Sequence, residues 1–204
     1  MRVVGGTARG KQLRVVPGRG TRPIMDRVKS SLFDILRPEI AGIEMLDLFA
    51  GSGSVGIEAL SQGAATCTFT ELAHAAVATI KQNLATTGLA GRAQVLQLDA
   101  FAYLKTTART FDLIYVAPPQ YKDLWSEALR LIAERPELLR ASAGESGEEP
   151  AAGQVIVQIH PKEYRALNLE SLRETRQRRY GNTLLVFFER ITAAGSKIIV
   201  LPSL

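Results

Sequence analysis

The sequence predicts an α/β fold, with a mostly parallel sheet and an antiparallel edge near the C-terminus. Between residues 44 and 160, short apolar segments alternate with amphipathic ones. Such alternation is typical of parallel sheets that are covered by helices and joined by right-handed crossovers. A glycine-rich turn follows the first apolar segment. A charged segment, Gly181-Asn182 and a strongly apolar segment come later, and this pattern predicts a hairpin that closes one edge of the sheet.

The first 37 residues are expected to form a small appendage to this fold. Two short β-like pieces, residues 2–4 and 12–16, are separated by glycines and predict a small β-hairpin or extended arm with little core of its own. Apolar residues recur at helical spacing over residues 26–36, which predicts a helix packed on the body. We therefore expect a basic arm and helix in residues 1–37 and one main domain in residues 38–204.

The alternating part of the chain predicts five strands, each a short apolar run of the length of a buried strand, and four helices between them. The strands are expected at residues 45–50, 66–71, 93–99, 111–117 and 154–160, and the helices at residues 55–62, 73–86, 101–106 and 122–134. Residues 140–152 are small, acidic and nearly free of large apolar groups, which predicts a loop. The hairpin is expected from residues 173–180 and 184–188, and residues 197–201 are a candidate for one further edge strand.

The composition indicates a single domain in a reducing compartment. A chain of 204 residues can bury a substantial core without disulfides or metals. The single cysteine, Cys67, lies in an apolar run and is expected in the core. No metal site is expected, because the two histidines are scattered and cysteines do not cluster. No apolar run approaches the roughly 20 residues of a membrane span, and the N-terminus does not resemble a secretion signal. We expect a cytoplasmic monomer without membrane contact.

Positive charge is concentrated near the N-terminus. Residues 1–37 contain nine Lys or Arg and two Asp, a net charge of +7, whereas the rest of the chain carries 16 basic and 18 acidic side chains. A polyanion-binding enzyme would use such a basic arm, because neutralising phosphates gives sequence-independent affinity and steers encounter. A solvated basic surface without a partner is the alternative.

Residues 44–56 hold the strongest ligand signal and read Glu-Met-Leu-Asp-Leu-Phe-Ala-Gly-Ser-Gly-Ser-Val-Gly. A strand, a glycine turn and a helix start bring backbone N–H groups close to a ligand. Glycine permits that close approach or a positive φ. The spacing is also a G-x-G-x-x-G pattern, which alone suggests a dinucleotide.

Three carboxylates lie within or at the ends of consecutive predicted strands, namely Asp47, Glu71 and Asp99. Ligands of open α/β sheets bind beyond the carboxyl ends of the strands, so we expect a shared site, although each acid could instead cap a helix. Glu71 follows Gly51 by 20 residues, the distance at which an acid receives a ribose diol. This spacing fits an adenosine-containing ligand and leaves nicotinamide dinucleotides and S-adenosylmethionine both open.

The segment Ala117-Pro118-Pro119-Gln120-Tyr121 follows the fourth predicted strand. Paired prolines fix an extended backbone whose carbonyls point outward. One interpretation is an ordinary rigid turn. The other is a clamp for an exocyclic amine, with carbonyl acceptors and an aromatic ring that stacks on a base.

Together these segments resemble the RsmD-type family of bacterial 16S ribosomal RNA guanine-N2 methyltransferases. The resemblance covers about residues 1–190, and its motifs are Met-Arg-Val-Val-Gly-Gly at 1–6, Thr-Arg-Pro at 21–23, Asp-Arg-Val at 26–28, Leu-Asp-Leu-Phe-Ala-Gly-Ser-Gly at 46–53, Gly-Ile-Glu-Ala-Leu-Ser at 56–61 and Tyr-Gly-Asn-Thr at 180–183. The resemblance implies a class I methyltransferase fold of Rossmann-like type, S-adenosylmethionine as cofactor, and 16S ribosomal RNA or the 30S particle as partner.

The resemblance also implies roles for individual residues. Asp47, Gly51 and Gly53 would lie against the methionine part of the cofactor. Glu71 would bind the ribose hydroxyls, and Asp99 with Ala100 would lie near the adenine. The expected cofactor site also includes Phe49, Ser52 and Leu72. The expected catalytic residues are Ala117, Pro118, Pro119, Gln120 and Tyr121, and the expected RNA-binding residues are Arg9, Lys11, Arg22 and Arg27.

One position departs from the family pattern. Such enzymes usually carry Asp or Asn, two prolines and then Tyr or Phe, whereas this chain has Ala117 and places the aromatic at Tyr121, after Gln120. Main-chain carbonyls of Ala117 and Pro118, with Gln120 or Tyr121, remain to contact the amine. One alternative is therefore an RNA-binding or assembly protein that keeps the fold without catalysis. The other alternative is a Rossmann-type NAD-dependent oxidoreductase.

Overall fold

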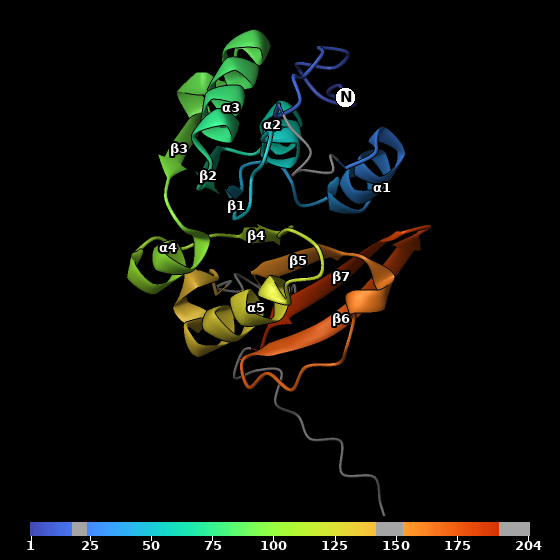
Figure 1. The fold of residues 1–204 in the computed structure, drawn as a ribbon, viewed down its shortest axis with the longest axis vertical. Coiled ribbons are helices and arrows are strands. Elements are labelled where there is room, and N and C mark those ends of the chain that lie inside the picture. Colours follow the sequence, from blue (N-terminus) through green and yellow to red (C-terminus); the bar gives the residue numbers. More distant parts are fainter. Residues whose placement is uncertain (18–23, 142–152, 192–204) are drawn as a thin grey trace, which may run out of the picture.

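The protein folds around one seven-stranded sheet with the strand order β3-β2-β1-β4-β5-β7-β6 (Figure 1). The computed structural model describes residues 1–17, 24–141 and 153–191. The sheet contains β1 (Glu44–Asp47), β2 (Thr66–Glu71), β3 (Ala93–Gln97), β4 (Leu113–Val116), β5 (Gln154–Ile159), β6 (Leu172–Tyr180) and β7 (Thr183–Arg190). The helices are α1 (Asp26–Leu36), α2 (Ser54–Ser61), α3 (His74–Thr87), α4 (Ala100–Thr106) and α5 (Leu124–Glu134), with short 3-10 turns at Ala90–Arg92, Pro136–Leu138 and Pro161–Glu163.

The predicted mixture of parallel and antiparallel strands is confirmed. Strands β1 to β5 pair in parallel, whereas β7 is antiparallel to β5 and β6 is antiparallel to β7. The two last strands are joined by the expected Gly181-Asn182 connection. Arg22 lies outside the described residues, as do the candidate strand at 197–201 and most of the loop predicted at 140–152.

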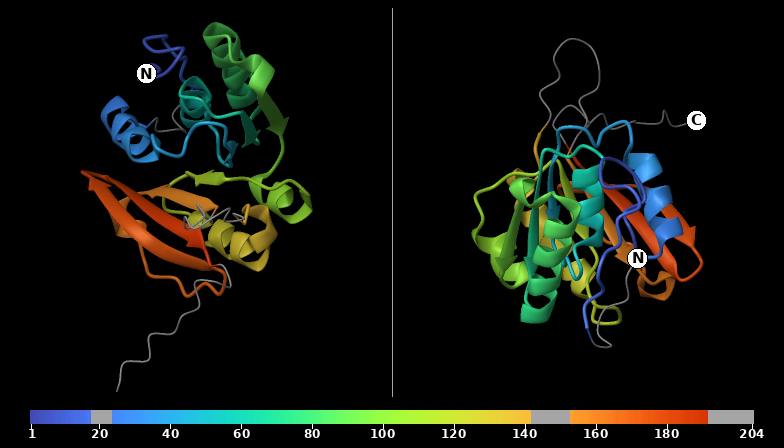
Figure 2. Two further views of the ribbon diagram at one scale, coloured as in Figure 1. Left: turned by 180° about the vertical axis from the view of Figure 1, so that it is seen from behind. Right: turned by 90° about the horizontal axis from the view of Figure 1, so that it is seen from above.

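The helices cover both faces of the sheet, as the alternation predicted (Figures 1 and 2). Apolar residues of α1, α2 and α3 pack on one face, in a core cluster that includes Leu32, Ile57 and Ile80. Helices α4 and α5 pack on the other face, where Leu104 and Leu129 belong to a second cluster. We refer to these as the α1 face and the α5 face. No described helix is long and apolar enough to cross a membrane.

More residues of the N-terminal arm are buried in the core than its sequence predicted. Its strands are reduced to a single antiparallel bridge between Arg2 and Gln12, yet Val3, Ala8 and Leu13 are all buried and belong to the core cluster of the α1 face. The three apolar side chains are spaced irregularly among glycines, so the sequence shows no strand or helix period. They reach the core because the arm folds back onto α2.

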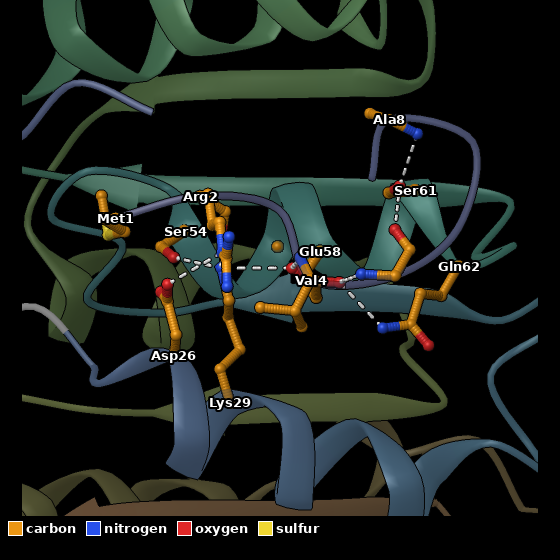
Figure 3. A network of polar contacts seen from close by, with 12 residues as sticks. Met1, Arg2, Val4, Ala8, Asp26, Lys29, Ser54, Glu58, Ser61 and Gln62 are labelled. Carbon is orange, nitrogen blue, oxygen red and sulfur yellow. Dashed lines mark hydrogen bonds and ion pairs between the residues drawn. The ribbon is translucent and has the colours of Figure 1, made fainter. Parts of the chain in front are cut away.

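A buried carboxylate holds the arm against α2 (Figure 3). Glu58 accepts hydrogen bonds from the backbone N–H groups of Val4 at 2.9 Å and Gly5 at 2.7 Å. Ser61 of the same helix donates to the Gly5 carbonyl and accepts from the Ala8 N–H. Residues that are distant in sequence therefore share one polar network, which holds the arm against the helix that follows the glycine turn.

Candidate functional site

A cavity of about 970 Å³ opens at the carboxyl ends of the parallel strands. The chain passes from β1 to β2 and β3 on one side, and β4 and β5 lie on the other, so β1 and β4 flank the switch in strand order. Ligands of open α/β sheets bind at such a switch. The lining includes Asp47, Phe49, Gly51, Ser52, Glu71, Leu72, Asp99, Ala100, Ala117, Pro118, Pro119 and Gln120. The sequence had assigned all of these residues to a shared site.

Asp47 places a buried carboxyl group at the floor of the cavity. It is only 2% exposed, and its Oδ2 accepts a hydrogen bond of 3.1 Å from the Gly56 N–H. Burial raises the pKa of Asp47 to about 7, because the charged form loses hydration, and the negative charge of Glu71 adds to the rise. A cationic group in the cavity would favour the ionised form of this acid.

Glu71 ties the glycine turn to the end of β2. Its Oε2 accepts from the Gly51 N–H at 2.9 Å, and its Oε1 accepts from the Ala73 N–H at 3.0 Å. A carboxylate fixed in this way at the rim of a cavity has remaining lone pairs for further donors. Glu71 thus sets the shape of the turn and stays available to a ligand.

The glycines of the turn are required for two different reasons. Gly51 and Gly53 have φ values of 54° and 75°, which favour glycine. Gly53 directly precedes α2. Gly56 has no positive φ, but a Cβ there would lie 2.3 Å from the Phe69 ring and 2.6 Å from the Cys67 sulfur. The first two glycines shape the turn, and the third permits close packing of α2 on β2, where Cys67 is buried as predicted.

Asp99 both caps a helix and lines the cavity, the two roles that the sequence left open. Its carboxylate accepts from the Ala102 N–H at 2.9 Å and caps α4, and the same residue lines the cavity. The cavity wall around it is apolar. Leu72 and Leu98 are 65% and 37% exposed, unusual for leucine, and both line the opening. This rim therefore offers apolar surface for a flat, weakly polar group.

The segment after β4 brings most, but not all, of its predicted residues to the cavity. Residues 117–120 line it. Tyr121 is not among the lining residues. Its φ of 61° turns the chain, its N–H donates to Glu163, and its ring centroid lies 5.6 Å from that of His160. Tyr121 is 67% exposed, so its ring is accessible beside the cavity.

Tyr115 and Gln158 are among the cavity residues that were not predicted. The Tyr115 hydroxyl donates to the Gln158 Oε1 at 2.5 Å, and both residues line the cavity. Val116 of β4 pairs with Val157 of β5, and continuing this register by one residue sets Ala117 beside Gln158. No sequence signal could have identified this pair, since it depends on the register of two strands far apart in the chain.

The predicted RNA-binding residues lie on the surface where the structure describes them. Arg9, Lys11 and Arg27 are exposed. The Lys11 ammonium donates to the Thr86 carbonyl at 3.0 Å, which anchors the arm to the end of α3. Arg22 lies outside the described residues. Within residues 1–17, 24–141 and 153–191, there is no cluster of three or more His, Cys, Asp or Glu side chains that could hold a metal ion.

The strand order and the cavity define the class of protein as a class I methyltransferase. The solved structure of the yhhF protein of Escherichia coli, provisionally described as a methyltransferase, matches this fold with a TM-score of 0.77 and 30% identity, over 93% of this chain and 97% of that one. A doubly wound dinucleotide-binding sheet has the order 3-2-1-4-5-6, whereas here the antiparallel β7 separates β5 from β6. The oxidoreductase alternative is not supported.

The chain belongs to the family described as Conserved hypothetical protein 95, the RsmD-type methyltransferase family, whose model matches residues 1–189. YlbH of Bacillus subtilis (strain 168), provisionally named an rRNA methyltransferase, is 41% identical over 142 residues, which cover 68% of this chain and 77% of that protein. The ribosomal RNA small subunit methyltransferase D of Escherichia coli (strain K12) is 38% identical over 134 residues, which cover 66% of this chain and 67% of that protein. The family resemblance seen in the sequence is confirmed.

Proposed function

We propose that the protein methylates the exocyclic N2 amine of a guanine in 16S ribosomal RNA, with S-adenosylmethionine as the methyl donor. The observation that carries this proposal is the cavity at the switch in strand order, which joins the buried carboxyl of Asp47 to the rigid segment at Ala117 and Pro118. The names of the relatives support a small-subunit ribosomal RNA substrate.

The residues of the cavity fit the donor. Asp47 is a buried acid whose charged form needs a cation, and the donor carries an ammonium and a sulfonium. Gly51 lines the cavity and lets the backbone approach the methionine part, whereas the predicted Gly53 is not among the lining residues and shapes the same turn through its positive φ. Glu71 has acceptor capacity for the ribose hydroxyls. The apolar rim at Leu72 and Leu98 suits the adenine ring.

When bound, S-adenosylmethionine supplies a methyl group that is already activated by its positive sulfur. The guanine N2 would attack this carbon in line, so that the N–C bond forms as the C–S bond breaks. The leaving group would be the neutral thioether S-adenosylhomocysteine, and the amine proton would pass to solvent. The protein therefore supplies mainly position and exclusion of water, and effective molarity can contribute about 7 to 11 kcal/mol. A strong general base is not required.

The amine end of the cavity would be formed by main-chain carbonyls. Ala117 has no side-chain acceptor, but it still has a main-chain carbonyl, as does Pro118. Both residues come directly after the buried strand β4, and the two prolines fix the backbone there. The polar side chains next to them are Gln120 and Gln158. We propose that Tyr121, exposed beside the opening, stacks on the target base or on its neighbour.

The basic N-terminal region is proposed to hold the RNA. Residues 1–37 carry a net charge of +7, and the arm packs beside the glycine turn through α2. Arg9, Lys11, Arg22 and Arg27 would contact phosphates, because neutralising phosphates provides affinity without reading sequence.

Two measurements test the proposal. The protein is incubated with unmethylated 30S particles and with naked 16S RNA, in each case with labelled S-adenosylmethionine, and the labelled nucleotide is mapped. Label on a guanine N2 is the expected result. Binding of the donor without label in either RNA would support the non-catalytic alternative. In calorimetry, binding of NAD but not of S-adenosylmethionine would overturn the cofactor assignment.

A further inference from the structure

The edge strand β6 is exposed along almost its whole length. Seven consecutive residues, from Arg173 to Arg179, are exposed, although β6 is hydrogen-bonded to β7 in an antiparallel ladder with one irregularity between Glu174 and Arg176. The Tyr164 hydroxyl donates to Glu174, but no described residue buries the arginines of this part of the strand. Four of the seven residues are arginines, and Glu174 is the single acid.

Three of these arginines have no acidic partner among the described residues. Arg176 lies over the Phe187 ring at 5.8 Å. Arg179 donates to the Gly181 carbonyl at 3.2 Å, and Arg178 makes one long contact of 3.5 Å to a neighbouring carbonyl. Arg173, in contrast, lies 3.7 Å from Glu189. The three unpaired guanidinium groups are thus positioned by the strand but keep most of their donors free.

The sheet register connects these arginines to the cavity. Gln158 of β5 pairs with Leu185 of β7, which pairs with Arg178 of β6. Directly paired residues point to the same face of a sheet, and Leu185 belongs to the core of the α1 face. Arg178 therefore lies on the face of the sheet that carries Tyr115 and Gln158. Three strand spacings separate Arg178 from the end of β4, roughly 14 Å.

The position of the hairpin supports the same connection. Strand β6 runs parallel to β5, so its end at Tyr180 lies at the edge of the sheet where the cavity opens. Figures 1 and 2 show α1 and the turn of this hairpin on the same side of the molecule. Helix α1, which carries the exposed Arg27, therefore lies on the same side of the protein as the hairpin turn that follows β6.

Protection of a sheet edge explains charge on β6 but not its sign. Charged side chains prevent an exposed edge from pairing with other chains. Acidic and basic residues can both do so, yet β6 has four arginines and one glutamate in a body that is otherwise slightly acidic outside residues 1–37. Planar guanidinium groups match phosphate geometry in two-point hydrogen bonds.

Arg176 pairs with Phe187 and lies on the same face as Arg178, whereas Arg179 pairs with Leu184 of the α5-face core and points to the other face. We infer that β6 is a second RNA-binding surface, on which Arg176 and Arg178 bind phosphates of the RNA segment that flanks the target nucleotide. This inference rests on the proposed function, since it assigns the RNA substrate a path from the cavity across β5 and β7 to the edge strand. The N-terminal arm and β6 then hold the substrate from two separate parts of the chain.

The test is the double variant Arg176→Gln, Arg178→Gln. Its matched control is Lys81→Gln, Lys105→Gln, which removes the same charge from exposed positions of α3 and α4. Binding of 16S RNA is measured over a range of salt concentrations. We expect the β6 variant to bind about 5-fold more weakly at low salt and to lose about 1.4 units of salt slope, as two lost phosphate contacts to single-stranded RNA would produce. The control should retain the slope of the unmodified protein.

Donor binding and thermal unfolding of both variants are measured in parallel, and both should match the unmodified protein. An unchanged RNA affinity and salt slope in the β6 variant would overturn the inference while leaving the proposed function intact. An equal loss of RNA affinity in the control would show that the effect comes from net charge alone, and it would also overturn the inference. Failure of the unmodified protein to bind or methylate RNA would instead contradict the proposed function.

Discussion

Lys29 of α1 and Glu58 of α2 form an ion pair from which water is excluded. The Lys29 Nζ lies 3.1 Å from Glu58 Oε2, and both side chains are 0% exposed. Lys29 also donates to the Arg2 carbonyl at 2.7 Å and to the Ser54 hydroxyl at 3.0 Å (Figure 3). Burial lowers the pKa of Lys29, and the charge of Glu58 opposes that shift. The pair joins two helices and the arm at one point.

Removing either charge of this pair should therefore destabilise the protein strongly. Lys29→Met leaves Glu58 buried without its cation, and we expect a loss of about 3 to 5 kcal/mol in the free energy of unfolding. Urea unfolding of Lys29→Met, Glu58→Gln and the double variant measures the coupling. The double variant should lose less than the sum of the two single losses. Additive losses, or a loss below about 1 kcal/mol for Lys29→Met, would contradict this account.

The raised pKa of Asp47 predicts an unusual pH dependence of stability. The folded-state pKa is about 7, against 3.8 for the unfolded chain. The folded protein therefore binds the extra proton between these values, so this contribution is fully present below about pH 4 and is lost as the pH rises through 7. Asp47→Asn removes the titration, and its amide oxygen can still accept from the Gly56 N–H.

The gap in unfolding free energy between Asp47→Asn and the unmodified protein should change with pH. From pH 5 to pH 8 it should move in favour of the asparagine variant by about 2 to 3 kcal/mol. Urea unfolding at both pH values measures the gap, and other titrating groups cancel in the comparison. A gap that stays constant would show that Asp47 titrates normally.

The local sequence pattern predicted the helices and strands, but it could not predict which residues of distant strands lie side by side. Helix α1 and strand β2 have the bounds that the sequence predicted, because their apolar residues are periodic and are bounded by polar or turn residues. The carboxylates at the strand ends were predictable from the topology rule. Tyr115 and Gln158 were not, because their contact depends on the register of β4 and β5. The burial of Val3 could not be predicted either, since the arm reaches the core only through contacts with α2.

The basic arm should contribute to RNA binding without affecting the donor. Arg9→Gln, Lys11→Gln and Arg22→Gln together remove three positive charges, and Arg9 and Lys11 are exposed. We expect weaker RNA binding and a salt slope reduced by about two units, with unchanged donor affinity in calorimetry. Lys11 also bonds the Thr86 carbonyl, so Lys11→Met alone serves as a control for loss of that contact. An unchanged salt slope in the triple variant would exclude the arm as an RNA contact.

Gln158 should position the target base. Its Oε1 is occupied by the Tyr115 hydroxyl, which leaves its amide N–H groups free to donate into the cavity beside Ala117. Guanine presents O6 and N3 as acceptors, so a fixed donor there would orient the base for attack through N2. Gln158→Ala should lower kcat about 10-fold, while donor affinity remains unchanged. It also leaves the buried Tyr115 hydroxyl without its acceptor, which should cost about 1 to 3 kcal/mol of stability.

Gln158→Glu separates positioning from this structural effect. The glutamate carboxylate still accepts from Tyr115, so stability should be retained, but no N–H remains to donate to the base. We expect Gln158→Glu to lose as much activity as Gln158→Ala, and Tyr115→Phe to lose less than either. These variants are compared by steady-state methylation of 30S particles and by urea unfolding. Wild-type activity in Gln158→Glu would assign Gln158 to support of Tyr115 alone, because only the acceptor oxygen would then matter.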